Sequence, residues 1–196
     1  MLPDTRYFER YACAQLKDLS AEYAALCCAD RPDLQDAQGR IGIEVTRAMR
    51  ENRKDALAFY REISGRAETV EDPAAEGLIL HAAKKKIDLL ARGEYAAFDK
   101  YGLYIFSAYD LTRDALARLL GYFYLMQRNN QKKYSVLFIN EVQKVYLCDP
   151  ATQTFLARTV TQAQQTRYEK KRPGAEPPRF FMIFEGAPAF APGNIF

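Results

Sequence analysis

The spacing of the apolar residues changes along this chain, and the change constrains the fold more than any other feature. Near the N-terminus they recur at steps of three and four, which predicts one long helix over residues 4–27. Over residues 40–46 the step shortens to two, with Ile41, Ile43 and Val45 on one side, as in a strand with one buried face. A chain that alternates between these patterns is expected to pack helices on a sheet.

The alternation continues to residue 160. Further helices are expected over 54–64, from the Asp72-Pro73 start to the Arg92-Gly93 stop, and over 112–128. Short β-type runs are expected to form strands at 103–106, 134–139, 142–147 and 154–160. The last three either extend the sheet or form a small lobe. The fold class expected is α/β, a mixed central sheet flanked by helices with extra C-terminal β strands.

Composition divides the chain into a body, residues 1–160, and a tail, residues 161–196. The stretch Arg158–Arg179 holds six basic and two acidic residues, so it carries +4 of a total net charge of +3 and leaves the rest at −1. The tail contains several prolines and no usable periodicity, which indicates a basic, Pro-rich arm. Its apolar segment, Phe180–Phe184, is expected to dock on the body or on a partner. A further alternative is a domain whose apolar tail, Phe180 to Phe196, mediates self-association.

Several classes of protein are disfavoured. The chain has no apolar run of about 20 residues, so no membrane-spanning helix is expected. No secretory leader is evident, and the four cysteines form no CxxC pair, which favours reduced thiols and a cytoplasmic location. The single histidine, His81, falls on the polar face of its predicted helix, which disfavours histidine-centred catalysis.

Two carboxylates near the predicted 40–46 strand form a candidate metal site. Asp33 follows Pro32, and Glu44 comes after ten intervening residues. Carboxylates on two adjacent extended segments can converge on one Mg²⁺ or Mn²⁺, with the carbonyl of Val45 as a third oxygen ligand. Such a metal polarises a phosphodiester and lowers the pKa of a bound water. The alternative is an ordinary turn aspartate and a solvent-facing strand glutamate.

The segment Pro32-Asp33, ten residues, then Glu44-Val45-Thr46 resembles the PD-(D/E)xK nuclease superfamily, over Asp4 to about Phe106. The resemblance implies a restriction-endonuclease-like core and a metal-dependent phosphodiesterase that cuts DNA. It also implies a helix before the Pro-Asp, and a helix and a strand after the Glu. This chain has Thr46 where the superfamily has lysine. An inactive relative that binds nucleic acid or protein is therefore the alternative function.

Lys86 is the candidate for the missing lysine. A helical projection places it in the middle of an apolar face, whereas Lys84 and Asp88 point away. That face consists of Ile79, Ala82, Ala83, Ile87 and Leu90. Some members of the superfamily are thought to supply the lysine from the helix after the metal-binding strand, and Lys86 is expected to act in this way. The alternative is a lysine that buries its stem and leaves its ammonium in water.

Other residues complete the predicted site. Glu9 and Glu22 flank the apolar stripe of the first helix, and either can reach toward the carboxylates, with Glu22 preferred. Gly42 and Thr46 flank Glu44 on its face of the strand, and their small size is expected to leave room for a ligand. Lys170, Lys171 and Arg172 of the arm are expected to hold nucleic-acid phosphates, which predicts salt-sensitive DNA binding.

Overall fold

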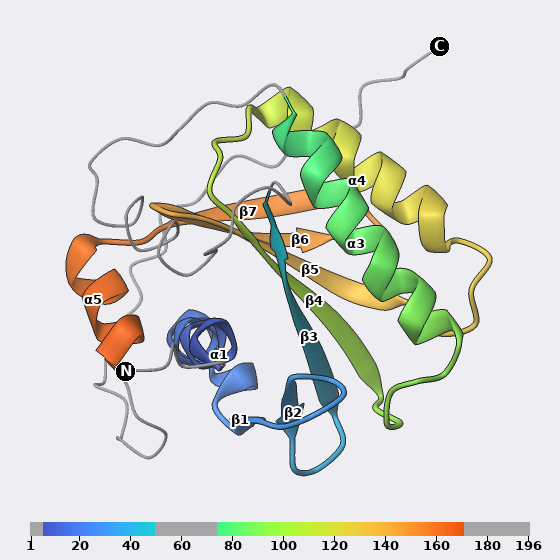
Figure 1. Ribbon diagram of the computed structural model, residues 1–196, viewed down its shortest axis with the longest axis horizontal. Helices are drawn as coiled ribbons and strands as arrows, with labels where there is room; N and C mark the ends of the chain where they lie inside the picture. The colour runs from blue at the N-terminus through green and yellow to red at the C-terminus, as the bar shows by residue number, and fades with distance from the viewer. Residues whose placement is uncertain (1–5, 50–73, 171–196) are drawn as a thin grey trace.

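The computed structural model describes residues 6–49 and 74–170 (Figure 1). Its helices are α1 (Tyr7–Leu19), the 3₁₀ turn η1 (Ala21–Tyr23), α3 (Ala75–Ala91), α4 (Arg113–Gln127) and α5 (Gln162–Lys170). Its strands are β1 (Leu26–Cys28), β2 (Leu34–Asp36), β3 (Ile41–Ala48), β4 (Lys100–Ser107), β5 (Tyr134–Glu141), β6 (Lys144–Asp149) and β7 (Thr154–Thr159). These elements confirm the expected α/β class.

The described strands form one mixed sheet, in the spatial order β1-β2-β3-β4-β5-β6-β7. Strands β3, β4 and β5 are parallel to one another, and the other neighbours pair antiparallel. Helix α3 lies in the connection between β3 and β4, and α4 connects β4 to β5, since parallel neighbours need such crossovers. The C-terminal strands therefore extend the sheet and do not form a separate lobe.

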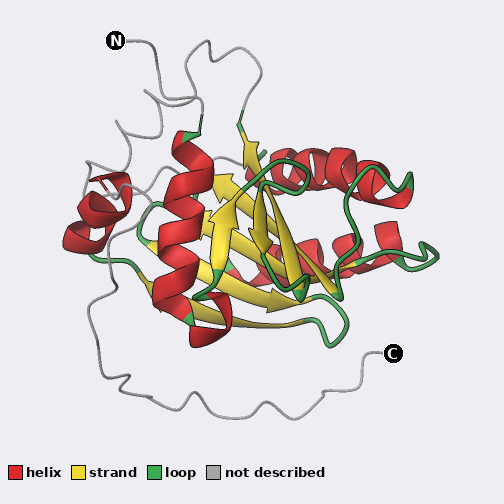
Figure 2. Cartoon of the chain, turned by 90° about the horizontal axis from the view of Figure 1, so that it is seen from below, coloured by secondary structure: helices red, strands yellow, loops and turns green. Residues whose placement is uncertain are grey.

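Helices cover both faces of the sheet, with α1 and α5 on one face and α3 and α4 on the other (Figures 1 and 2). Strand β3 contributes to both layers because its successive side chains point to opposite faces. Ile41, Ile43 and Val45 are buried in the core that includes α1, as the alternation predicted. Glu44 points the other way and meets α3. The direction of each β3 side chain thus decides which helix it meets.

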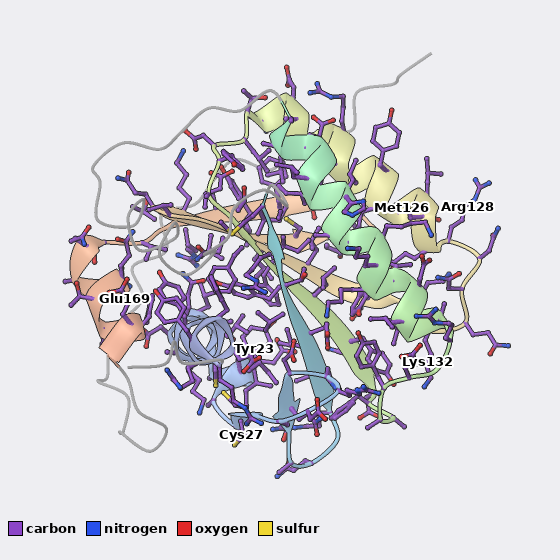
Figure 3. The ribbon with its side chains drawn as sticks, viewed as in Figure 1. Tyr23, Cys27, Met126, Arg128, Lys132 and Glu169 are labelled. Carbon is purple, nitrogen blue, oxygen red and sulfur yellow. The ribbon has the colours of Figure 1, made fainter. Side chains whose placement is uncertain are left out.

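The first helix is shorter than predicted, because α1 ends at Leu19 and not near residue 27. Ser20 adopts an extended conformation, and its hydroxyl accepts a hydrogen bond from the Glu22 backbone N–H at the start of η1. Tyr23, which is labelled in Figure 3, and Leu26 are both buried, but Tyr23 belongs to η1 and Leu26 belongs to β1. Their spacing imitates another helical turn, which explains the error.

Residues 162–170 form helix α5, so the prediction of an arm without regular structure from residue 161 is wrong for this stretch. Tyr168 is buried against Tyr11 of α1, with ring centroids 5.3 Å apart. The Tyr7 hydroxyl donates a hydrogen bond of 3.2 Å to Glu169, which is labelled in Figure 3. Tyrosine contacts with α1 therefore hold a helix whose sequence is mostly polar.

Two predictions fall outside the described residues, namely the helix over 54–64 and the course of the arm over 171–196. The predicted helices 72–92 and 112–128 are confirmed as α3 and α4, and all the predicted strands are present. Within the described ranges, none of the helices has the length and apolar character needed to cross a membrane.

A buried carboxyl group lies at the end of β5. Glu141 is fully buried, and it accepts hydrogen bonds from the Leu111 backbone N–H at 2.8 Å and from the Tyr146 hydroxyl at 3.2 Å. Burial, together with the neighbouring Asp110 carboxyl, raises the pKa of Glu141 to about 8, while Lys144 opposes this shift. The folded protein therefore holds a proton that the unfolded chain releases near its ordinary pKa of about 4.3.

This difference predicts how stability depends on pH. Between about pH 5 and 8 the unfolded chain binds fewer protons at this site, so stability falls as pH rises, by up to about 1.4 kcal/mol per pH unit. Urea unfolding at several pH values measures this slope. Glu141→Gln removes the site's contribution, whereas Glu22→Gln, at an exposed glutamate, keeps it. An unchanged slope in Glu141→Gln contradicts the assignment.

A second prediction concerns Gly42 of β3. A Cβ atom added there would lie 2.6 Å from Pro32 Cγ and 2.8 Å from Phe98 Cδ2, both closer than contact allows. Gly42→Ala is therefore expected to lower the free energy of unfolding by about 1–3 kcal/mol. Gly77→Ala is the control, because nothing lies within 4 Å of a Cβ at that helical position and alanine is the better helix former. Equal stabilities of the two variants in urea would contradict the packing.

Candidate functional site

Asp33 lies in the turn before β2 and is tied to β3. Its Oδ2 accepts a hydrogen bond of 2.8 Å from the backbone N–H of Val45. The carbonyl of Val45 points to the same edge of β3, because the N–H and C=O of one strand residue share a direction. Continuing the β2–β3 register by two residues places Pro32 opposite Val45, and proline has no N–H to offer that carbonyl. Asp33 and the Val45 carbonyl are thus directed to one edge.

Glu44 of β3 and Lys86 of α3 form an ion pair on the face of the sheet that α3 covers. Lys86 Nζ lies 2.5 Å from Glu44 Oε1, although 42 residues separate them in the chain. The Glu44 side chain is only 6% exposed and that of Lys86 is 23% exposed. The apolar face predicted for this helix is buried as expected, so Lys86 is directed inward, while Lys84 pairs with Asp88 at the surface. The reading in which the Lys86 ammonium extends into water is therefore wrong.

The electrostatics of the two acids follow from burial and charge. Burial raises the pKa of Glu44, the Asp33 carboxylate raises it further, and Lys86 and the nearby Tyr95 hydroxyl oppose the rise. Burial also raises the pKa of Asp33, and the Val45 N–H and Lys86 oppose that shift. Both acids therefore bind a proton more readily than they do in water, and both gain from added positive charge.

Glu9 is a third acid near this pair, and the preference for Glu22 over Glu9 is wrong. Burial raises the pKa of Glu9, and so do the charges of Asp33 and Glu44. Glu22 instead forms an exposed ion pair of 3.6 Å with Lys100. The first turn of α1 lies over the end of β3, since the Arg47 guanidinium carbon is 5.0 Å from the Phe8 ring centroid. No pattern in the sequence indicates that the first turn of α1 lies over the end of β3.

The acids near β3 have oxygens that are unpaired among the described residues and that bear on the predicted metal site. Glu44 Oε2 and Glu9 Oε2 are both buried, and neither accepts a hydrogen bond of ordinary length from the described residues. An unpaired buried carboxylate oxygen is costly and favours a cation. Among residues 6–49 and 74–170, no group of three or more Asp, Glu, His or Cys side chains is arranged around a common ion position. The candidate oxygen donors are the Asp33 and Glu44 carboxylates and the Val45 carbonyl.

The remaining predictions concern the space beside Gly42 and the three basic residues of the arm. The space expected beside Gly42 is filled by Pro32 and Phe98, so any room for a ligand lies elsewhere along β3. Lys170 is the last residue of α5, which packs against α1, and Lys171 and Arg172 lie outside the described residues. Among the described residues, the structure brings together Asp33, Glu44 and Lys86.

Comparisons with family models, with curated proteins and with solved structures found no match to this chain.

The Lys86–Glu44 pair predicts a specific loss of stability. Lys86→Met leaves the Glu44 carboxylate buried without its ammonium, and the free energy of unfolding is expected to fall by about 2–3 kcal/mol at pH 8. The loss shrinks at lower pH, because the pKa of Glu44 rises further without Lys86 and the acid then takes up a proton. Urea unfolding at pH 5 and 8 measures both effects.

The matched control is Lys84→Met, on the same helix. Its pair with Asp88 is exposed, so the expected change is below about 0.5 kcal/mol. Equal losses in the two variants would show that the Lys86–Glu44 pair is not a buried interaction.

Proposed function

We propose that this chain is a metal-dependent nuclease-like protein that hydrolyses phosphodiester bonds in DNA. The observation that carries the proposal is the 2.5 Å pairing of Lys86 with Glu44. It supports the view that α3 supplies the lysine that position 46 lacks, as the resemblance to the PD-(D/E)xK superfamily implies.

The order of elements adds support. Helix α1 precedes the Pro32-Asp33 segment, β3 carries Glu44, and α3 and β4 follow it, with β4 parallel to β3. This is the order that the resemblance to a restriction-endonuclease-like core implies. Strands β5 to β7 are additions to it on the far side of β4.

Asp33, Glu44 and the carbonyl of Val45 are the proposed metal ligands, and all three present oxygen, the donor that Mg²⁺ and Mn²⁺ prefer. The ion, when bound, supplies Lewis acidity and lowers the pKa of a water. Glu9 adds negative charge to the same region.

The roles of the protein groups follow from their contacts. The Val45 N–H fixes one oxygen of Asp33 and leaves the other available. Lys86 holds one oxygen of Glu44 and keeps that acid charged, because its ammonium opposes the effect of burial on the pKa. With substrate present, the same ammonium is suited to hold an attacking water or a phosphate oxygen.

DNA is the proposed partner. The basic residues of the arm carry positive charge suited to binding the phosphates of the nucleic-acid backbone; they are Lys170, Lys171 and Arg172. All four cysteines are free, which suits the reducing cytoplasm that we propose as the location.

A second function is favoured by a specific observation. Each acid already has a partner within the protein, Val45 for Asp33 and Lys86 for Glu44, and Glu44 is only 6% exposed. A fold that has lost catalysis and serves as a binding or interaction module would keep such contacts for stability alone. Metal binding at Asp33 and Glu44 separates the two functions.

The proposal predicts cleavage of supercoiled and single-stranded DNA by the full chain with Mg²⁺ or Mn²⁺. Glu44→Ala and Lys86→Met are each expected to lower the rate by about two to four orders of magnitude. Glu22→Gln, which alters an exposed pair with Lys100, is the matched control and is expected to cut normally. Retention of cleavage by Glu44→Ala would show that the nuclease site lies elsewhere or that the activity is a contaminant.

A further inference from the structure

Strand β7 forms one edge of the sheet, and no described strand pairs with its outer side. The Val160 N–H donates 2.8 Å to the carbonyl of Gln143, just before β6, and this fixes which backbone groups face β6. Because direction alternates along a strand, the N–H groups of Leu156 and Arg158 also face β6. The N–H and C=O groups of Phe155, Ala157 and Thr159 therefore point outward from the sheet.

The side chains of this edge strand are unusually open. Five of the six β7 residues are exposed, and Leu156 exposes 54% of its surface. Leu156 lies opposite Leu147, which is itself only partly buried at the margin of the α1 core. Phe155 is the partly buried residue, packed against Tyr146 with ring centroids 6.0 Å apart. An open edge with an exposed leucine is a template for another strand.

The chain carries a segment with the complementary property. Phe180–Phe184 reads Phe-Phe-Met-Ile-Phe, five apolar residues with no charge and no proline. Aromatic and β-branched residues favour strands, and leaving each such side chain in water costs about 2 kcal/mol relative to burial. The segment therefore gains by burial and has the sequence of a strand.

The connection is long enough for this segment to reach β7. Two residues separate the strand's last residue, Thr159, from the start of helix α5, and the nine residues of α5 span about 13 Å. The end of α5 is therefore within about 25 Å of Thr159. Residues 171–179 span up to about 30 Å when extended. Phe180 can return to the Thr159 end of β7, and the segment then runs antiparallel toward Thr154.

We propose that Phe180–Phe184 adds to the sheet as an eighth strand, antiparallel to the outer edge of β7 in the same molecule. The outward groups of Phe155, Ala157 and Thr159 supply its backbone hydrogen bonds, and Leu156 lies beneath its apolar side chains. A short tether holds the segment at an effective concentration in the millimolar range, far above that of a second copy in micromolar solution. This proposal does not depend on nuclease activity.

Residue-resolved hydrogen exchange on the full chain tests it. The Ala157 and Thr159 amides are expected to exchange at least about tenfold more slowly in the wild type than in the double variant Phe181→Asp, Ile183→Asp. The Leu156 and Arg158 amides, which face β6, are expected to be equal in both and serve as internal controls. The double variant Ala189→Asp, Ala191→Asp adds the same charge outside the segment and is expected to match the wild type.

Molar mass measured by light scattering at the same concentration completes the test. Slow exchange at Ala157 and Thr159 in a monomer supports docking within one molecule. Slow exchange only in a dimer overturns it in favour of exchange between copies. Equal and fast exchange of both amides in the wild type and the Phe181/Ile183 variant overturns the proposed strand altogether.

Discussion

The ion pair between Glu44 and Lys86 is the interaction on which the arrangement of this protein depends. A carboxylate in the middle of a sheet, under a helix, costs several kcal/mol unless a positive charge meets it. Lys86 meets it only if α3 lies over β3 with its apolar face inward. The pair therefore fixes the position of this helix along the sheet, in addition to any chemistry at the site.

The alternating faces of β3 explain how one strand serves two purposes. Ile41, Ile43 and Val45 belong to the core beneath α1, so the strand is held firmly on that side. Glu44 faces α3, while the backbone of Val45 is directed to the edge where Asp33 lies. A turn, a strand and a helix thus each contribute one charged side chain to a small region, with apolar packing around it to fix their directions.

The sequence predicted the parts of this site that depend on local pattern. The alternation of apolar residues predicts β3 and the direction of Glu44, and the position of a lysine on an apolar helical face indicates Lys86. The end of α1 was missed because Tyr23 and Leu26 are buried from other elements at helical spacing. Three-residue strands such as β1 and β2 are too short to show a period, and α5 is too polar to show an apolar stripe.

The periodicity of the sequence does not distinguish Glu9 from Glu22. Both flank the same stripe, and only the crossing of α1 over the end of β3 decides between them. Packing of that kind depends on residues far apart in the chain. Periodicity carries no information about such packing. For the same reason it does not indicate that Pro32 and Phe98 fill the space beside Gly42.

Metal binding by the full chain tests the central claim most directly, because it separates a metal centre from a structural ion pair without requiring turnover. Calorimetric titration with Mn²⁺ is expected to show a site in the wild type that is lost in Asp33→Asn and in Glu44→Gln. Glu94→Gln, at an exposed pair with Arg92, is expected to retain it. Wild-type protein that binds no Mn²⁺, or binding that survives both substitutions, would contradict the account and leave the acids with a structural role alone.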